Sequence, residues 1–161
     1  MSDSPLDRVM ATIEQRMVEA IPAQEWSDLL RQTKPLRIKL GIDPTASALH
    51  LGHTVVLSQL RLLQDVGHQV VLIIGDFTAR IGDPTGKTAT RVPLSKEAVD
   101  AHASAYQRQI FRILDPQRTQ VRYNSEWLDA LGTADLIELA SAQTVARMLE
   151  RDDFSKRYAA G

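Results

Sequence analysis

The sequence contains no cysteine, only 5% aromatic residues and no long apolar run. The lack of cysteine excludes disulfide bonds, thiolate zinc sites and cysteine nucleophiles, so we expect any metal to arrive with a substrate. No stretch reaches the roughly 18 uninterrupted apolar residues of a membrane span. The polar N-terminus also lacks the apolar centre of a secretory signal. These absences predict a cytoplasmic protein with no membrane partner and no protein-bound metal.

A strong charge of one sign is lacking as well. The net charge of −1 is not that of a domain whose main task is to grip nucleic-acid phosphates. If RNA is a partner, most of its contacts are expected outside this chain. What is present, 43% hydrophobic and 24% charged residues in 161 positions, suits one globular domain with a sizeable core.

Apolar spacing divides the first half of the chain into helices and strands. Spacings of three and four predict an amphipathic helix over the first twenty residues or so, to Ile21, and a short helix around Trp26. Strict alternation predicts a strand over residues 36–43. Residues 49–66 follow as a helix closed by Gly67, and residues 70–74 are apolar on both faces, as in a central strand covered by helices.

The second half is predicted to continue the alternation of strands and helices. We expect a loop over residues 75–93, a long helix capped by Ser95 and running to Leu114, and a short strand at residues 121–123. Thr133 is the expected cap of another helix, and residues 144–158 are expected to be helical. The predicted fold is α/β, a Rossmann-like parallel sheet with flanking helices preceded by an N-terminal helical segment, with ligands at the carboxyl ends of the strands.

The letters HLGH open the helix that follows the first strand. His50 and His53 lie three positions apart on one face, and the start of a helix offers unpaired N–H groups and partial positive charge to a phosphate. Gly52 has no side chain to keep a ring off the backbone. With Asp43 at the strand end, this pattern predicts stabilisation of a triphosphate as charge shifts. The alternative is that one histidine merely packs at the helix start.

The letters GDPTGKT, which begin at Gly82, look like a phosphate-binding P-loop but are one residue too short between the glycines. Lys87 and Arg91 can still hold pyrophosphate, because both side chains only donate hydrogen bonds. The alternative is a solvated turn shaped by proline and glycine.

Three segments together closely resemble bacterial tyrosyl-tRNA synthetases, which are class I enzymes. They are GIDPTASALHLGH, GDFTARIGDPTGKTATR and VARMLERDDFSKRY, and the resemblance runs essentially from end to end of the chain. The first segment is the HIGH signature, which other synthetases share. The other two are far more specific. The resemblance implies ATP-dependent activation of L-tyrosine, with Mg²⁺ bound to ATP, transfer to tRNA(Tyr), and a homodimer.

The resemblance also implies roles for individual residues. The candidates for catalysis are Thr45, His50, His53, Lys87 and Arg91. Those for binding ATP are Gly41, Asp43, Pro44, His50, Gly52 and His53. The candidates for binding tyrosine are Asp83, which matches the acid that receives its ammonium, Thr78 near that group, and Lys39. Because Lys39 stands where one branch has a tyrosine that helps recognise the substrate hydroxyl, we expect that recognition to be arranged differently here or to depend on later residues.

Residues 1–161 are expected to form a single domain, the N-terminal part of the catalytic domain. No GGTDQ-like segment, KMSKS loop or RNA-binding module occurs in the sequence, so the C-terminal catalytic half is expected to be absent. Two alternatives stay open. One is a non-catalytic nucleotide-binding or dimerisation module, in which Val145, Met148, Leu149 and Phe154 form an interface or pack on their own core. The other is a small HxGH nucleotidyltransferase, which leaves the segments after Ile74 unexplained.

Overall fold

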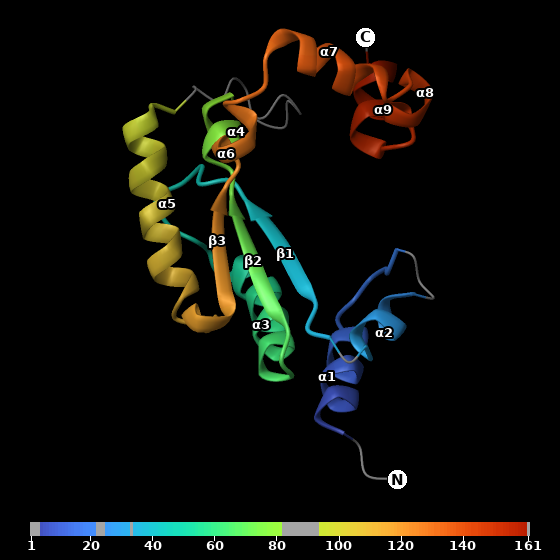
Figure 1. The fold of residues 1–161 in the computed structure, drawn as a ribbon, viewed down its shortest axis with the longest axis vertical. Coiled ribbons are helices and arrows are strands. Elements are labelled where there is room, and N and C mark those ends of the chain that lie inside the picture. Colours follow the sequence, from blue (N-terminus) through green and yellow to red (C-terminus); the bar gives the residue numbers. More distant parts are fainter. Residues whose placement is uncertain (1–3, 22–24, 33, 82–93, 161) are drawn as a thin grey trace.

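A parallel sheet of three strands forms the centre of the molecule (Figure 1). The structure, a computed structural model, describes residues 4–21, 25–32, 34–81 and 94–160. The strands are β1 (Arg37–Ile42), β2 (Gln69–Ile74) and β3 (Thr119–Tyr123), paired in the order β1-β2-β3. Because all three run in the same direction, their carboxyl ends meet at one edge. The predicted α/β class with a parallel sheet is confirmed.

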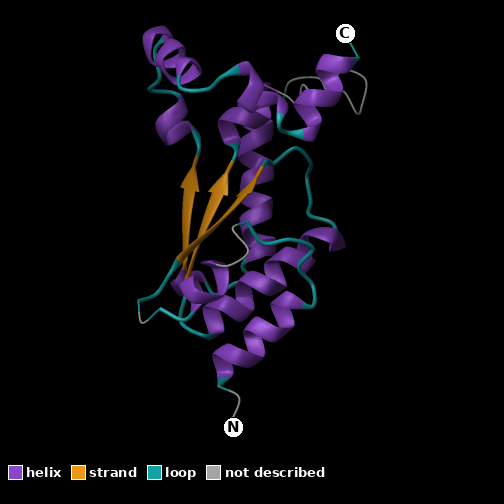
Figure 2. Cartoon of the chain, turned by 90° about the vertical axis from the view of Figure 1, so that its right-hand side faces the viewer, coloured by secondary structure: helices purple, strands orange, loops and turns teal. Residues whose placement is uncertain are grey.

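Two long helices, α3 (Leu51–Asp65) and α5 (Lys96–Ile110), link the strands and cover the same face of the sheet (Figure 2). Their apolar sides meet the strand residues that point to this face, since side chains alternate along a strand. The buried residues of this core are Leu57, Leu60, Val70, Leu72, Ile74, Ala103, Tyr106, Ile110 and Leu114. This packing fixes where the start of α3 lies relative to the end of β1.

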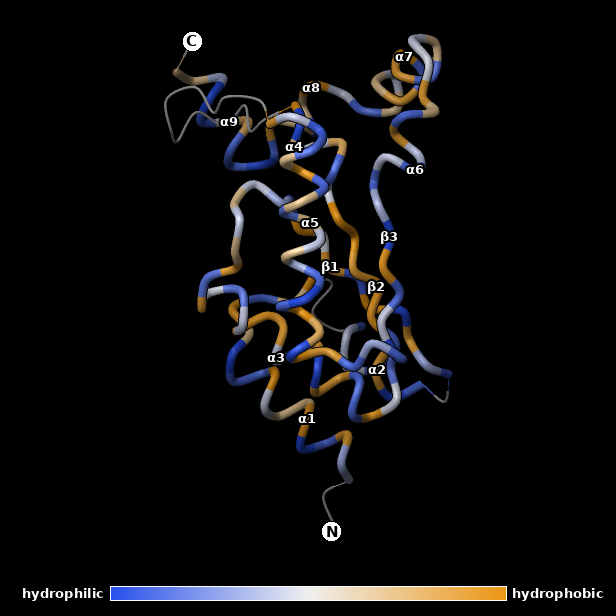
Figure 3. The backbone as a smooth tube through the Cα atoms, turned by 90° about the vertical axis from the view of Figure 1, so that its left-hand side faces the viewer, coloured by the Kyte–Doolittle hydropathy of each residue, from blue (hydrophilic) through white to orange (hydrophobic). Residues whose placement is uncertain are grey.

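The other face of the sheet differs from the prediction. The hydrophobic run of β2 continues along the strand (Figure 3), but no described helix packs against its second face. Val71 is nevertheless buried, between Lys39 and Gln120 in the strand register. A strand that is apolar on both faces is therefore buried, but helices need not cover both of its faces. Among the described residues, β1 pairs on one side only, with β2.

The N-terminal helices α1 (Pro5–Glu14) and α2 (Glu25–Leu30) form a second, smaller core with α3, in which Met10, Leu30 and Leu63 are buried. The prediction that the first helix continues to Ile21 is wrong. α1 ends at Glu14, and Ile21 is 84% exposed, because the apolar side of the chain finds nothing to pack on beyond the second core.

A capping box fixes the start of α1. The Ser4 hydroxyl accepts the Asp7 N–H at 3.1 Å, and the Asp7 carboxylate accepts the Ser4 N–H at 3.2 Å. The hydrogen bond from the Ser4 hydroxyl and that from Arg31 lower the pKa of the Asp7 carboxyl. The Arg31–Asp7 pair, at 2.7 Å, also joins α2 to α1.

The segment after β2 was predicted to be a loop from residue 75, and this is wrong for its first part. α4 (Asp76–Ile81) begins directly after Gly75, and the Ala79 N–H donates to the Gly75 carbonyl. Ala79 is buried, so packing stabilises this short helix. The sequence shows no sign of this, because polar residues flank Ala79. Residues 82–93, the rest of the predicted loop, lie outside the described residues.

α5 starts after Ser95, whose hydroxyl accepts the Ala98 N–H, as predicted. The helix ends at Ile110 and not at Leu114, because the chain must turn before Pro116, where a helix cannot continue. The turn leads through η1 (Pro116–Arg118) into β3, and neither η1 nor α6 (Ser125–Leu128) was predicted.

The C-terminal part lies beyond the carboxyl ends of the strands (Figure 1) and consists of α7 (Thr133–Ser141), α8 (Val145–Leu149) and α9 (Asp152–Ala159). Gly132 and not Thr133 is the cap of α7. The prediction that residues 144–158 are helical is confirmed, although the extended backbone at Arg151 divides them into two helices and two aspartates start the second one. No described helix is both long and apolar enough to cross a membrane.

Candidate nucleotide-binding site

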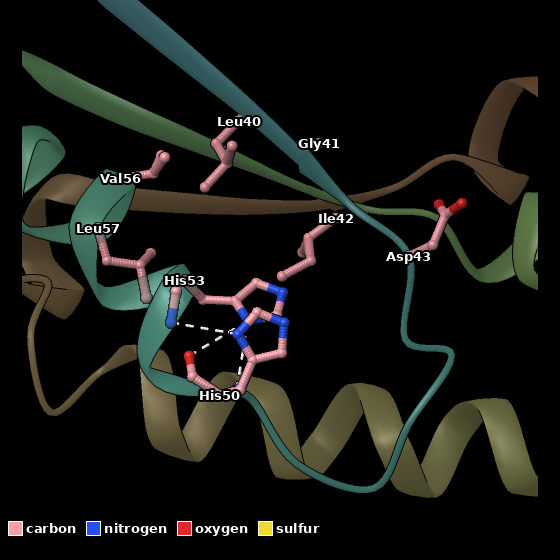
Figure 4. A pocket seen from close by; sticks show the side chains of 9 residues that line it. Leu40, Gly41, Ile42, Asp43, His50, His53, Val56 and Leu57 are labelled. Atoms are coloured by element: carbon pink, nitrogen blue, oxygen red, sulfur yellow. Dashed lines mark hydrogen bonds between the residues drawn. The ribbon is translucent and has the colours of Figure 1, made fainter. Parts of the chain in front are cut away.

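A cavity of about 440 Å³ lies where β1 ends and α3 begins (Figure 4). β1 ends at Ile42, the chain passes through residues 43–49, and α3 starts after His50. The residues that line the cavity are Leu40, Gly41, Ile42, Asp43, His50, Gly52, His53, Val56 and Leu57. The cavity thus has an apolar wall from β1 and α3, and its polar groups gather at the carboxyl edge of the sheet, where parallel α/β folds bind ligands.

His50 caps α3 with its own side chain. Its Nδ1 accepts the Gly52 N–H at 3.1 Å, and its backbone is extended, as is usual for an N-cap. An imidazole nitrogen that accepts a hydrogen bond carries no proton in the neutral ring, so the proton of His50 is on Nε2. His50 is exposed and lines the cavity, so this Nε2–H is a donor held in a fixed direction.

His53 lies one turn into the helix, with its ring centroid 4.0 Å from that of His50. Its Nδ1 lies 3.3 Å from both the N–H and the carbonyl oxygen of His50, so its tautomer decides whether Nδ1 accepts from the one or donates to the other. Figure 4 shows both rings projecting from the start of α3 toward Ile42. Two imidazole rings and the positive end of a helix therefore line one cavity, and with the Nε2–H of His50 as a donor the arrangement is suited to phosphate oxygens.

Gly52 has a steric reason to be glycine. A Cβ at this position would lie 2.9 Å from both Nδ1 and Cε1 of His50, closer than such atoms normally approach. The free space above Gly52 is therefore used by the capping imidazole. The absence of a side chain here supports the orientation of His50.

Asp43 is held by hydrogen bonds that cross all three strand ends. The Thr78 hydroxyl, on α4 after β2, donates to Asp43 Oδ1 at 2.8 Å. The Asn124 amide, directly after β3, donates to the Thr78 oxygen at 3.0 Å and accepts the Phe77 N–H at 2.8 Å. Asn124 is only 7% exposed, so its amide has few alternative partners. This chain fixes the direction of the Asp43 carboxylate.

Gly75 makes room for this hydrogen-bond chain. A Cβ at Gly75 would lie 1.8 Å from Asp43 Oδ1 and 2.6 Å from the Thr78 hydroxyl oxygen. Any larger residue would push the carboxylate and the hydroxyl apart. Gly75 is thus a requirement of the site and not only of the turn after β2.

The remaining predicted site residues have different positions. Pro44 is buried and Thr45 is half-buried in the segment between β1 and α3. Lys39 is exposed and alternates with Leu40 and Ile42, so its side chain points away from the cavity. Asp83, Lys87 and Arg91 lie outside the described residues. Within the described residues, no group of three or more His, Asp or Glu side chains gathers in a way that could hold a metal.

Sequence reasoning missed the residues that support the site. Asn124, Gly75, His102 and Gln109 each hold or make room for a candidate residue through a contact between segments far apart in the chain. Only Gly75 carried a local signal, as a glycine directly after a strand. The others look like ordinary polar residues until the sheet brings the segments together.

Comparison with known families agrees with this geometry. The family model described as tRNA synthetases class I (W and Y) matches residues 31–161, most of the chain. The chain belongs to this family. The residues His50 to His53 at the start of α3 match the HIGH signature of class I synthetases.

Several proteins named as tyrosine–tRNA ligases are similar to this class I synthetase chain. Tyrosine–tRNA ligase 2 of Vibrio parahaemolyticus is 55% identical over 97% of this chain, and the Ralstonia nicotianae ligase is 56% identical over 89%. The chain spans 40% and 38% of the lengths of these two relatives.

Solved structures of class I synthetases share the fold. A C-terminally truncated mitochondrial tyrosyl-tRNA synthetase from Coccidioides posadasii has a TM-score of 0.72 at 25% identity, covering 99% of this chain and 46% of that one. The Plasmodium falciparum tryptophanyl-tRNA synthetase has a TM-score of 0.59 at 18% identity, covering 79% of this chain and 34% of that one. The fold alone is therefore common to the tyrosine and tryptophan enzymes.

Proposed function

We propose that this chain is the N-terminal part of the catalytic domain of a tyrosine–tRNA ligase. Such an enzyme activates L-tyrosine with ATP to form tyrosyl-adenylate and pyrophosphate, and then passes the tyrosyl group to tRNA(Tyr). The observation that carries the proposal is the cavity at the start of α3, which is lined by Asp43, His50 and His53 and in which the His50 Nε2–H lies at a helix N-terminus. Identity of 55% to tyrosine enzymes over 97% of the chain favours tyrosine over tryptophan as the amino acid.

The proposed roles on the ATP side follow from where the residues lie. His50, with Thr45, stabilises the α-phosphate as the tyrosine carboxylate attacks it, because its Nε2–H is aimed at the cavity before reaction. His53 and the N-terminal N–H groups of α3 bind phosphate oxygens. Gly41, Pro44 and Gly52 shape the cavity for the nucleotide, and Asp43 accepts hydrogen bonds from it. Lys87 and Arg91 engage pyrophosphate, and Mg²⁺ arrives with ATP.

The tyrosine side of the proposal depends partly on sequence alone. Asp83 receives the substrate ammonium, with Thr78 near the same group. Lys39 points to the face of the sheet opposite the cavity, next to Val71 and beside Gly41. We therefore propose that the amino acid side chain lies toward that second face, where Lys39 can approach its hydroxyl.

The proposal extends to the setting of the enzyme. A homodimer is supported by the exposed apolar residues of α7 and α8, and a cytoplasmic location by the function itself. The two alternatives are less well supported. A non-catalytic module does not need two histidines that line one cavity at a helix start. A small nucleotidyltransferase does not explain the match of the family model through residue 161.

Exchange of labelled pyrophosphate into ATP tests the proposal. The assay is run with each amino acid separately, on this chain and on the full-length protein. Exchange that depends on tyrosine in the full-length protein is the expected result. Exchange with tryptophan instead would reassign the substrate, and nucleotide binding without any exchange would favour the non-catalytic module.

A further inference from the structure

One face of α5 contacts the segment that carries the candidate catalytic residues. His102, Tyr106 and Gln109 are spaced four and three positions apart, so they lie on one side of the helix. Each of them approaches a different part of residues 44–53. α5 itself lines no part of the cavity.

The two polar residues hold the two ends of the link between β1 and α3. His102 Nδ1 lies 3.1 Å from the Pro44 carbonyl oxygen, so a proton on Nδ1 makes this a hydrogen bond. Gln109 Oε1 accepts the Leu49 N–H at 2.9 Å, directly before the N-cap His50. A connecting segment normally lacks fixed partners for its backbone groups, and α5 supplies one at each end.

The third contact is aromatic. Tyr106 is only 2% exposed, and its ring centroid lies 6.4 Å from that of His53. The His53 ring in turn lies 4.0 Å from that of His50. A buried side chain has little freedom, so Tyr106 limits how far the two imidazoles can shift.

We propose that this face of α5, formed by His102, Tyr106 and Gln109, is a positioning surface that holds Thr45 and His50 in their reactive orientation. The three side chains act through residues 44–53 and do not contact the reacting atoms. Preorganised donors lose much of their effect when they are displaced by a fraction of an ångström to an ångström. The expected effect on the rate of tyrosyl-adenylate formation rests on the proposed function. The expected effect on the position of residues 44–53 does not.

The decisive substitutions change one hydrogen bond at a time. Gln109→Met keeps the length of the side chain and removes the acceptor for the Leu49 N–H. Gln109→Glu keeps an acceptor oxygen. Arg108→Met, at the exposed neighbouring position, is the matched control. In the full-length protein we expect Gln109→Met to lower the saturated rate of tyrosyl-adenylate formation about 10-fold. Tyrosine affinity should be unchanged, and Gln109→Glu and Arg108→Met should stay near the wild-type rate.

A second pair of variants, His102→Leu and His102→Asn, tests the same proposal if a Gln109 variant folds poorly. The Asn amide can still donate to the Pro44 carbonyl, so His102→Asn should retain the rate that His102→Leu loses. A double-mutant cycle with His50→Ala tests whether Gln109 affects the rate through His50. If Gln109 acts through His50, Gln109→Met should have little further effect once His50 is gone.

Backbone hydrogen exchange gives a readout that needs no catalysis. Gln109→Met should speed exchange at the Leu49 amide, while exchange in β2 stays unchanged. Faster exchange together with a normal rate would overturn the positioning role. Unchanged exchange at Leu49 would overturn the structural contact itself. A wild-type protein with no tyrosine-dependent activity would instead contradict the proposed function. The hydrogen-exchange result at Leu49 does not depend on that function, so the two failures can be told apart.

Discussion

The two ring nitrogens of His50 have separate tasks. Nδ1 closes the start of α3 through the Gly52 N–H, and Nε2 carries the proton that faces the cavity. The residue thus contributes to helix stability and, in the proposed function, to transition-state stabilisation. Because asparagine is itself a good N-cap, these two contributions can be measured apart.

We expect His50→Asn to slow tyrosyl-adenylate formation in the full-length protein by roughly 10²- to 10³-fold, the usual effect of deleting one preorganised donor. The free energy of unfolding should change little. His50→Ala should lose the same rate and, in addition, about 1 kcal/mol of stability from the missing cap. Single-turnover measurements across ATP concentrations and chemical denaturation give both quantities. Collapse of ATP affinity with a normal saturated rate would make His50 a binding residue.

Gly75 is the most restrictive position in the site. We expect Gly75→Ala to break the Thr78–Asp43 hydrogen bond, because the new Cβ would lie 1.8 Å from Asp43 Oδ1. Overpacking of this kind costs about 1–3 kcal/mol of stability, and adenylate formation should fall with it. Gly41→Ala is the control for stability alone, since a Cβ there meets nothing within 4 Å. Equal stability of the two variants, measured by denaturation, would show that the carboxylate can move aside.

At the scale of single residues, the sequence predicts those that belong to a local motif. Asp43, His50 and His53 follow from a motif at a strand-to-helix turn, and the structure brings them to one cavity. Asn124 is different, because its role comes from lying beside Thr78, and the two are far apart in sequence. Only the sheet register determines that contact.

The elements are joined by a few buried polar residues, of which Gln64 on α3 is the clearest. Gln64 is 1% exposed, and its amide nitrogen lies within 3.3 Å of the carbonyls of Asp115 and Arg118 and of the Thr119 hydroxyl. Its oxygen accepts the Asp115 N–H at 2.9 Å. One side chain thereby links the end of α3 to η1 and to the start of β3.

We expect Gln64→Leu to destabilise the protein by about 1–3 kcal/mol, because the Asp115 N–H loses its Gln64 acceptor and the Arg118 carbonyl loses its Gln64 donor. The exposed Gln117 on η1 offers a matched control, and Gln117→Leu should change stability by less than about 0.5 kcal/mol. Urea denaturation at constant pH measures both. A Gln64→Leu variant as stable as the control would mean that the polar link contributes nothing.

His68 joins the starts of β1 and β2, and its charge state matters. Nδ1 accepts the Leu36 N–H at 3.2 Å, and the residue is 4% exposed. Burial lowers the pKa of His68 from its usual 6.5. As the pH falls below about 6.5, the unfolded chain therefore takes up this proton before the folded protein does. The contribution of His68 to stability should be constant above that pH, decrease below it, and level off below the lowered pKa.

Denaturation curves of wild type and His68→Asn between pH 8 and about pH 5 test this prediction. The Asn oxygen can still accept the Leu36 N–H but cannot titrate. The difference between the two proteins isolates His68 from the other histidines. Parallel pH profiles would contradict the assignment.

The predictability of an element follows its length and packing. α3 and α5 were predicted because each repeats the apolar spacing over several turns, and Ser95 supplies a cap. α4 and α6 were missed because a helix of one or two turns has too few positions to show a period. The break at Arg151 was missed for a different reason. No glycine or proline marks it, and its local signal is the pair Asp152 and Asp153, which are weak helix formers but common in the first turn of a helix.

At the scale of the whole molecule, apolar surface is concentrated in the C-terminal helices. α7, α8 and α9 contain no buried residue, and Leu136, Ile137 and Leu139 on α7 are each at least 52% exposed. Exposed apolar patches mark contact surfaces in soluble proteins. This patch supports the proposed homodimer.

We expect Ile137→Lys in the full-length protein to shift the mass measured by sedimentation from dimer toward monomer, because the ammonium would be buried in the contact. Glu138→Gln changes the charge by the same amount without touching the apolar patch and should leave the dimer intact. If both variants sediment like the wild type, α7 lies outside the contact.

Among the described residues β1 pairs on one side only, and this also affects how this chain behaves in solution. An unpaired strand edge offers free N–H and C=O groups to the same edge of another copy, which is how soluble sheets begin to aggregate. Here Lys39 is exposed along that strand, whereas the Arg37 guanidinium reaches across the sheet and donates to Gln120 on β3 at 3.1 Å. Two copies approaching edge to edge would bring their Lys39 ammonium groups together, and the repulsion between them disfavours the contact. Because the repulsion is screened over about 10 Å at 0.1 M salt and over less at higher concentrations, colloidal stability should be best in dilute buffer.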